Sequence, residues 1–136
     1  MSVIVLMGLP GSGKSTFALG GSAVIICQDV LKSRAICMME THRSLTLGLD
    51  VVIDRTNVTE IQRGYWVNIA KTYHCPVFCI WFDVPKDLCH QRTISRKNHP
   101  NFNLSDADKL KVITRFEKEL EPPTYAEGFD LVLKFT

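Results

Sequence analysis

The chain has 136 residues, of which 46% are hydrophobic and 22% charged, and its 16 Lys and Arg against 14 Asp and Glu give a formal net charge of +2. This is the composition of an ordinary globular protein, and the length predicts a single domain over residues 1–136 that leaves no room for an appended module. A net charge this small carries no information about partners.

The cysteines and the apolar runs exclude several further classes of protein. The five cysteines are odd in number and form no Cys-x-x-Cys pair, so the sequence predicts neither a disulfide framework nor a zinc site. No apolar stretch is long enough to span a membrane, and the N-terminal apolar run is too short for a signal peptide. We therefore expect an intracellular protein, nuclear or cytoplasmic, without a membrane partner. No protein partner can be inferred.

A glycine-rich segment directly follows the first apolar run. Residues 8–16 read Gly-Leu-Pro-Gly-Ser-Gly-Lys-Ser-Thr and come after the apolar residues 3–7, which predict a central parallel strand. The spacing is that of a P-loop (Walker A), whose backbone N–H groups surround nucleotide phosphates. Lys adds a cation and the next Ser offers a hydroxyl to Mg²⁺. The sequence therefore predicts a site for ATP and Mg²⁺ that includes Gly11, Ser12, Gly13, Lys14, Ser15 and Thr16.

The rest of the chain alternates between strands and helices. After the P-loop comes a helix that the pair Gly20-Gly21 ends after little more than a turn. The patterns then predict strands over 23–27, 50–54, 77–82 and 129–135, the last at an edge, and helices from 30 to 45, after 59, after 85 and after 105. This order predicts an α/β fold of the P-loop NTPase type: three αβα layers, a five-stranded mainly parallel sheet and a small helical lid at about 86–104.

One of these helices carries a clear start signal. Thr59 and Gln62 have the spacing of a capping box. The helical period then predicts a buried stripe made of Ile61, Tyr65, Ile69, Ala70 and Tyr73.

Three acidic residues follow the second, third and fourth strands, where a parallel sheet binds its ligands. For Asp29 two interpretations stay open: it is the N-cap of the next helix, or it is a base that accepts the proton of an acceptor hydroxyl. Asp54 is expected to reach Mg²⁺ through water as a Walker-B-like carboxylate, and Asp83 is expected to cap a helix. Arg92 and Arg96 lie four residues apart on one helical face, either as solvated surface residues or as lid cations for the phosphates.

Five blocks together make the chain resemble the 5′-hydroxyl polynucleotide kinase family. This resemblance is to the kinase domain of bifunctional polynucleotide kinase/phosphatases and to related modules fused to aprataxin-like proteins. The blocks are residues 8–17, Gln28-Asp29-Val30-Leu31, residues 52–57, the pair Arg92 and Arg96, and residues 121–129. The resemblance implies an ATP-dependent kinase that transfers the γ-phosphate to the 5′-OH ends of DNA or RNA, in end healing or repair.

The resemblance also implies roles for individual residues. Asp29 is the general base, and Lys14 and Arg96 complete the catalytic set, while Arg92 and Arg96 clamp the phosphates of ATP from the lid. Ser15 and Asp54 serve the metal. The acceptor strand is bound by the group Asp29, Lys32, Arg34, Asp54, Thr56 and Asn57. Lys32 stands where phage-type members of the family have arginine, and lysine cannot make a bidentate contact.

The sequence also departs from that family. Gln28 stands where arginine is common, the first helix is short, and the Asp-x-Asp-Gly-Thr phosphatase signature is absent, so no phosphatase activity is expected of this chain. Two alternatives remain open: a small-metabolite P-loop kinase of the gluconate or shikimate type, and a catalytically idle nucleotide-binding module. No feature separates DNA from RNA as the acceptor.

Overall fold

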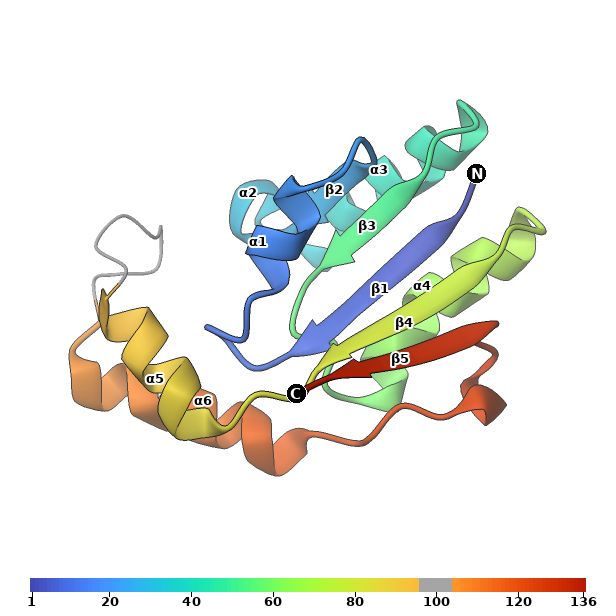
Figure 1. The fold of residues 1–136 in the computed structure, drawn as a ribbon. Coiled ribbons are helices and arrows are strands. Elements are labelled where there is room, and N and C mark those ends of the chain that lie inside the picture. Colours follow the sequence, from blue (N-terminus) through green and yellow to red (C-terminus); the bar gives the residue numbers. More distant parts are fainter. Residues whose placement is uncertain (96–103) are drawn as a thin grey trace.

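The computed structural model describes residues 1–95 and 104–136, apart from the side chains of Leu19 and Asp29 (Figure 1). Within these residues five strands form one sheet in the order β2-β3-β1-β4-β5, and every neighbouring pair is parallel. The parallel sheet and the position of the last strand at its edge confirm the prediction. The strands are β1 (Val3–Gly8), β2 (Val24–Cys27), β3 (Val51–Asp54), β4 (Val77–Phe82) and β5 (Leu131–Phe135).

Helices cover the two faces of this sheet unequally. The helices α3 and α4 pack on one face, the short α1 lies on the other, and α5 and α6 lie together beside the carboxyl ends of the strands (Figure 1). This arrangement confirms the αβα layering. The helices are α1 (Lys14–Leu19), α2 (Gln28–Leu31), α3 (Arg34–Thr46), α4 (Glu60–Thr72), α5 (Lys86–Ser95) and α6 (Asp106–Glu119), followed by the 3₁₀ helix η1 (Tyr125–Glu127).

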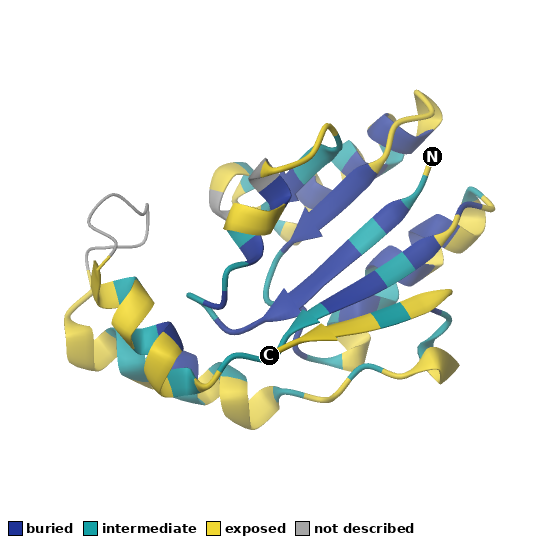
Figure 2. Ribbon diagram, viewed as in Figure 1, coloured by how far each residue is buried: buried dark blue, intermediate teal, exposed yellow. Residues whose placement is uncertain are grey.

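Strand β1 lies at the centre of the core. Its residues Val3, Val5 and Met7 join the larger hydrophobic cluster beneath α3 and α4, whereas Leu6 joins a smaller cluster with Ala18 of α1. Both faces are therefore covered, which explains the uninterrupted apolar run. Figure 2 shows the central strands buried and β5 largely exposed.

The helix predicted over 30–45 is two helices. The helix α2 ends at Leu31, and its C-cap Lys32 has a left-handed φ of 70°. Ser33 then caps α3 by accepting a 3.1 Å hydrogen bond from the Ile36 N–H. The apolar spacing continues across this break, so the sequence pattern does not reveal that the helix is interrupted. The N-caps of the two helices are Cys27 and Ser33, and Asp29 is the second residue of α2. The interpretation of Asp29 as an N-cap is therefore wrong.

The capping box of α4 is confirmed. The predicted buried stripe is confirmed at Ile69 and Ala70, with Tyr65 and Tyr73 partly buried, and is wrong at Ile61. The side chain of Thr59 accepts from the Gln62 N–H at 3.2 Å, and the Gln62 side chain accepts in return from the Thr59 N–H. Ile61 is 75% exposed, whereas Arg63 and Trp66 are fully buried. The helix therefore turns a charged residue inward, which requires a partner elsewhere in the fold.

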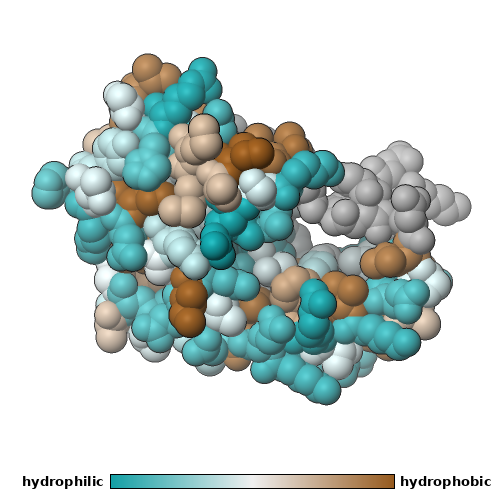
Figure 3. Space-filling model, turned by 180° about the vertical axis from the view of Figure 1, so that it is seen from behind, coloured by the Kyte–Doolittle hydropathy of each residue, from teal (hydrophilic) through white to brown (hydrophobic). Residues whose placement is uncertain are grey.

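Seen from behind, the outer side of the helix layer is mostly hydrophilic, with separate hydrophobic groups (Figure 3). None of the described helices is both long enough and apolar enough to cross a membrane. The thiols of Cys37, Cys75, Cys79 and Cys89 are buried. Burial raises the pKa of Cys79 to about 12, so this thiol stays protonated and is a poor nucleophile at neutral pH.

Candidate active site

The P-loop joins β1 to α1 through two glycines in the left-handed region. Gly11 has a φ of 85°, and Gly13, the N-cap of α1, has a φ of 103°. A Cβ on Gly11 would lie 2.5 Å from the carbonyl oxygen of Cys89 in α5. Glycine is required there both for the backbone angle and for the close approach of α5. The loop therefore lies directly against the helix that was predicted to begin the lid.

Lys14 begins α1 and places a buried cation under the P-loop. Its residue is 7% exposed, and its Nζ donates to the carbonyl oxygens of Gly8 and Leu9 at 2.8 Å each and to the Ser12 Oγ at 3.3 Å. The first N–H groups of any α-helix lack partners within the helix, so the ammonium and the helix start present positive charge together. This arrangement suits the phosphates of a nucleotide.

Ser15 and Asp54 bring together the predicted metal ligands. The Ser15 hydroxyl donates to the Asp54 Oδ2 at 2.9 Å, and Asp54, the last residue of β3, is buried. Mg²⁺ prefers oxygen ligands and keeps several waters, so it needs only one or two side chains from the protein. The pair therefore fits the predicted metal role. The described residues contain no larger cluster of His, Cys, Asp and Glu that could hold a metal.

The loop after β3 is tied to the P-loop and to the core. The Thr56 carbonyl accepts a 3.0 Å hydrogen bond from the Gly8 N–H. Asn57 is 2% exposed, and its side-chain amide donates to the Leu6 carbonyl at 2.7 Å and accepts from the Trp66 Nε1 at 3.0 Å. Because the amide nitrogen and the amide oxygen of Asn57 both bond within the protein, this side chain holds the loop in position. Asn57 is therefore not available to contact an acceptor.

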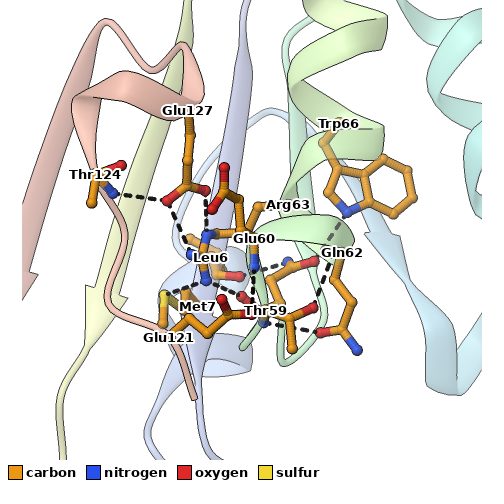
Figure 4. A network of polar contacts seen from close by, with 11 residues as sticks. Leu6, Met7, Thr59, Glu60, Gln62, Arg63, Trp66, Glu121, Thr124 and Glu127 are labelled. Atoms are coloured by element: carbon orange, nitrogen blue, oxygen red, sulfur yellow. Dashed lines mark hydrogen bonds and ion pairs between the residues drawn. The ribbon is translucent and has the colours of Figure 1, made fainter. Parts of the chain in front are cut away.

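A buried ion pair between Arg63 and Glu127 stabilises the same loop (Figure 4). The guanidinium of Arg63 donates to both carboxylate oxygens of Glu127, at 2.8 Å from Nε and 3.0 Å from Nη2, and its Nη1 donates to the Asn57 carbonyl at 3.0 Å. Glu127 also accepts from the Thr124 N–H at 2.8 Å. The sequence analysis missed Arg63 because its partner lies 64 residues away.

The same network explains the motif at 121–129. The Glu121 N–H donates to the Val58 carbonyl at 2.7 Å, and its carboxylate accepts from the Glu60 N–H at 3.3 Å (Figure 4). Together with Glu127, this residue holds the segment after α6 against the loop that follows Asp54 and the start of α4. Glu121 and Glu127 therefore stabilise the loop next to the candidate site without being part of the site.

Arg92 lies on α5 beside the P-loop. Its Nη1 is 3.5 Å from the Gly11 carbonyl oxygen, and its side chain is solvent-exposed. The structure thus brings one of the two predicted lid arginines to the loop. Arg96 and the side chain of Asp29 lie outside the part of the chain that the structure describes. Asp83 forms a 3.2 Å ion pair with Lys134 of β5, so we place it outside the site.

Three basic residues lie near the carboxyl ends of β2 and β3. Lys32 is exposed at the end of α2, and Arg34 opens α3 with its guanidinium 4.2 Å from the centre of the Tyr65 ring. Arg55, which the sequence analysis did not select, directly follows Asp54. Burial lowers the pKa of Arg55 below its usual value, and the charge of Arg34 acts in the same direction.

The sheet order, the P-loop and the Ser15–Asp54 pair define a nucleotide-binding protein with a P-loop kinase fold. A family model described as an AAA domain matches residues 28–123, and the chain therefore belongs to this family. Over 135 residues it is 32% identical to a "Bifunctional polynucleotide phosphatase/kinase" of Schizosaccharomyces pombe, covering 93% of this chain and 31% of that relative. The resemblance drawn from the motifs is confirmed, although the chain spans less than a third of that relative's length.

Solved structures give the same fold. Chaetomium thermophilum Kti12 in complex with ADP-AlF3 superposes with a TM-score of 0.71 at 16% identity, covering 98% of this chain and 88% of that one. A gluconokinase from Sinorhizobium meliloti 1021 gives a TM-score of 0.63 at 17% identity, covering 98% and 81%. At these identities the likeness shows the fold alone.

Proposed function

We propose that the chain is an ATP-dependent 5′-hydroxyl polynucleotide kinase that acts on DNA or RNA ends in end repair. The observation that supports this most directly is the contact between Ser15 and Asp54 beside the buried Lys14. It joins the nucleotide loop to a carboxylate at the end of a neighbouring strand, which is how P-loop phosphotransferases hold a metal–nucleotide complex. The polynucleotide acceptor is supported by the relative that is named for it.

In this proposal ATP binds with its phosphates on the backbone of residues 11–16 and against Lys14. Ser15 and Asp54 would hold Mg²⁺, which neutralises phosphate charge when it is bound. Arg92 approaches from α5 and, with Arg96, stabilises the negative charge on the phosphates during transfer. Lys14, Ser15 and Asp54 are already in contact with the P-loop or with each other in the structure.

The acceptor would approach from the side of β2. The register pairs Cys27 with Asp54, so α2 begins beside the end of β3 and carries Asp29 to the same edge. The acceptor 5′-oxygen would form a bond to the γ-phosphorus while the bond to the β–γ bridging oxygen breaks. Asp29 would take the hydroxyl proton, and ADP would leave. We further propose that Lys32, Arg34 and Thr56 flank the acceptor.

The test is transfer of labelled γ-phosphate from ATP and Mg²⁺ to a 5′-OH oligonucleotide, as DNA and as RNA. Labelling of 5′-OH strands but not of the 5′-phosphorylated control is the expected result. Gluconate and shikimate serve as competing acceptors, because the fold is shared with a gluconokinase. ATP binding without transfer to any oligonucleotide would contradict the proposal. Transfer to a small metabolite would replace it by the first alternative, and no transfer at all by the idle module.

A further inference from the structure

The turn after β3 bends at a buried asparagine in the left-handed region. Asn57 has a φ of 48° and is 2% exposed. Lys32 and His74, the other non-glycine residues with a positive φ in the described part of the chain, are both exposed. Asparagine adopts this backbone conformation more readily than most residues. Residues in sparsely populated conformations cluster at functional sites, where the surrounding structure holds them.

Asn57 continues the pairing between β3 and β1 beyond the end of β3. The last register pair of the two strands is Leu6 with Asp54. Past that pair, the Asn57 side chain donates to the Leu6 carbonyl at 2.7 Å. The Thr56 carbonyl then accepts from the Gly8 N–H at 3.0 Å. The path of the chain after Asp54 is therefore fixed at two points near the end of β1, where the P-loop begins.

The turn and the P-loop share bonds on both sides of Gly8. The Gly8 N–H donates to Thr56, and the Gly8 carbonyl accepts from the Lys14 Nζ at 2.8 Å. Two residues before Thr56, Asp54 accepts from the Ser15 hydroxyl at 2.9 Å. A displacement of this turn would therefore change both contacts with the first turn of α1, the one from Lys14 and the one from Ser15.

The Asn57 amide is held in one orientation. Its Oδ1 accepts from the Trp66 Nε1 at 3.0 Å, whereas its Nδ2 donates to Leu6, so exchange of the two amide atoms would bring donor to donor and acceptor to acceptor. The backbone carbonyl of Asn57 accepts from the Arg63 Nη1 at 3.0 Å, and both partners on α4 are fully buried (Figure 4). Aspartate has the same shape but no donor, so it cannot replace asparagine here without loss of the bond to Leu6.

We propose that Asn57 is a positioning residue for the proposed phosphate transfer and acts through Asp54 and the P-loop. This inference rests on the proposed function and extends it: contact with the acceptor, which the resemblance implies for Asn57, is replaced by support of the metal carboxylate. Phosphoryl transfer depends on the placement of metal and nucleotide, and a shift of about 1 Å in such a site can reduce the rate about 10²-fold. Asn57 itself contacts neither ATP nor the acceptor.

The test separates the chemical step from acceptor binding. Asn57→Asp should reduce kcat about 10²-fold, because the bond to Leu6 is lost, and leave the KM for a 5′-OH oligonucleotide unchanged. It should also weaken the effect of Mg²⁺ on ATP affinity, measured as the ratio of the Kd values of fluorescent ATP without and with the metal. Trp66→Phe keeps a ring but removes the donor to Oδ1, so we expect kcat to fall about fivefold, as for one lost hydrogen bond.

Ser44→Ala is the matched control for a loss of stability alone. Ser44 is 3% exposed near the C-terminal end of α3, and its hydroxyl donates to the Glu40 carbonyl of the same helix at 2.8 Å. The variant loses a buried hydrogen bond, so it should lower the melting temperature without changing kcat or the Mg²⁺ ratio. All rates are compared at a temperature at which each variant is folded.

The outcomes distinguish the role of Asn57 from the proposed function. A folded Asn57→Asp with the kcat and the Mg²⁺ ratio of the wild type would overturn the inference. A raised oligonucleotide KM at unchanged kcat would overturn it too, because that is the result of an acceptor contact. If Asn57→Asp does not fold, Trp66→Phe decides in the same way. If the wild type transfers no phosphate, the proposed function is contradicted; a reduced Mg²⁺ ratio in Asn57→Asp then still supports the placement of Asp54 by Asn57, and a wild-type ratio overturns it.

Discussion

Arg63 of α4 differs in its surroundings from Arg34 and Arg55, which lie over aromatic rings of the same helix. Arg63 is fully buried, and its Nε, Nη1 and Nη2 all donate to protein acceptors, two of them on Glu127. Arg34 and Arg55 have aromatic neighbours but no carboxylate partner among the described side chains. A buried charge with satisfied donors belongs to the architecture. Arg34 is exposed and Arg55 partly buried, so both retain contact with solvent near the candidate site.

Arg63 supports the candidate site from within the core. Arg63 connects α4, the Asn57 loop and Glu127 near the C-terminal end of the chain. Removal of one partner of a buried pair leaves an uncompensated charge, which costs far more than the pair contributes when it is intact. The loop after Asp54 therefore depends on a contact that reaches neither ATP nor an acceptor.

The largest expected effect comes from breaking that pair. Glu127→Ala should lower the free energy of unfolding by about 3–5 kcal/mol, because Arg63 would stay buried without its partner. Urea denaturation measures this loss. The control is Glu40→Ala, which breaks the exposed pair with Arg43 and should change stability by less than about 1 kcal/mol. Equal losses in the two variants would show that the buried pair is not structurally important.

The next effect separates chemistry from stability. Asp29→Ala should reduce phosphate transfer by about 10²-fold or more, the usual effect of a lost acid–base group, while ATP affinity stays nearly constant. Steady-state kinetics and nucleotide binding measure the two quantities. Asp83→Ala is the matched control, since Asp83 also follows a strand but pairs with Lys134. An equal loss of ATP binding in Asp29→Ala would contradict its role as the base.

A third variant tests whether Arg55 contributes to stability. Arg55→Leu removes a partly buried charge that lies near Arg34, so we expect unchanged or slightly higher stability, by up to about 1 kcal/mol. Thermal unfolding measures this effect. A loss of stability as large as that of Glu127→Ala would show that Arg55 supports the fold as Arg63 does.

The smallest effect concerns an exposed carboxylate with a local partner. The hydrogen bond from the Ser2 hydroxyl, at 2.9 Å, is the main cause that lowers the pKa of Asp50. A lowered pKa stabilises the fold above the unfolded pKa of about 3.9, and this contribution is lost as pH falls through the folded value. Asp50→Asn should therefore change stability slightly at pH 7 and not at all well below pH 3. Denaturation at the two pH values measures the difference, and an equal effect at both would contradict it.

Features that depend on neighbouring residues in the chain were predictable. The P-loop spacing, the apolar strands and the Thr59 capping box each follow from backbone and side-chain chemistry within a few residues. The same local information placed Lys14, Ser15 and Asp54 in one site, because the ends of parallel strands meet at one edge. It failed at Lys32, where a left-handed residue divides a helix although the hydrophobic period continues.

The sequence by itself determined that this chain builds a parallel sheet with a nucleotide loop, because those signals are short and periodic. Only the tertiary structure decided which polar side chains belong to the fold and which face a ligand. Asn57, which the resemblance placed at the acceptor, and Arg63 are buried because Leu6, Trp66 and Glu127 supply their hydrogen-bond partners. The contact of Arg34 with Tyr65 of α4 is of the same kind, because it joins residues that lie 31 positions apart in the sequence.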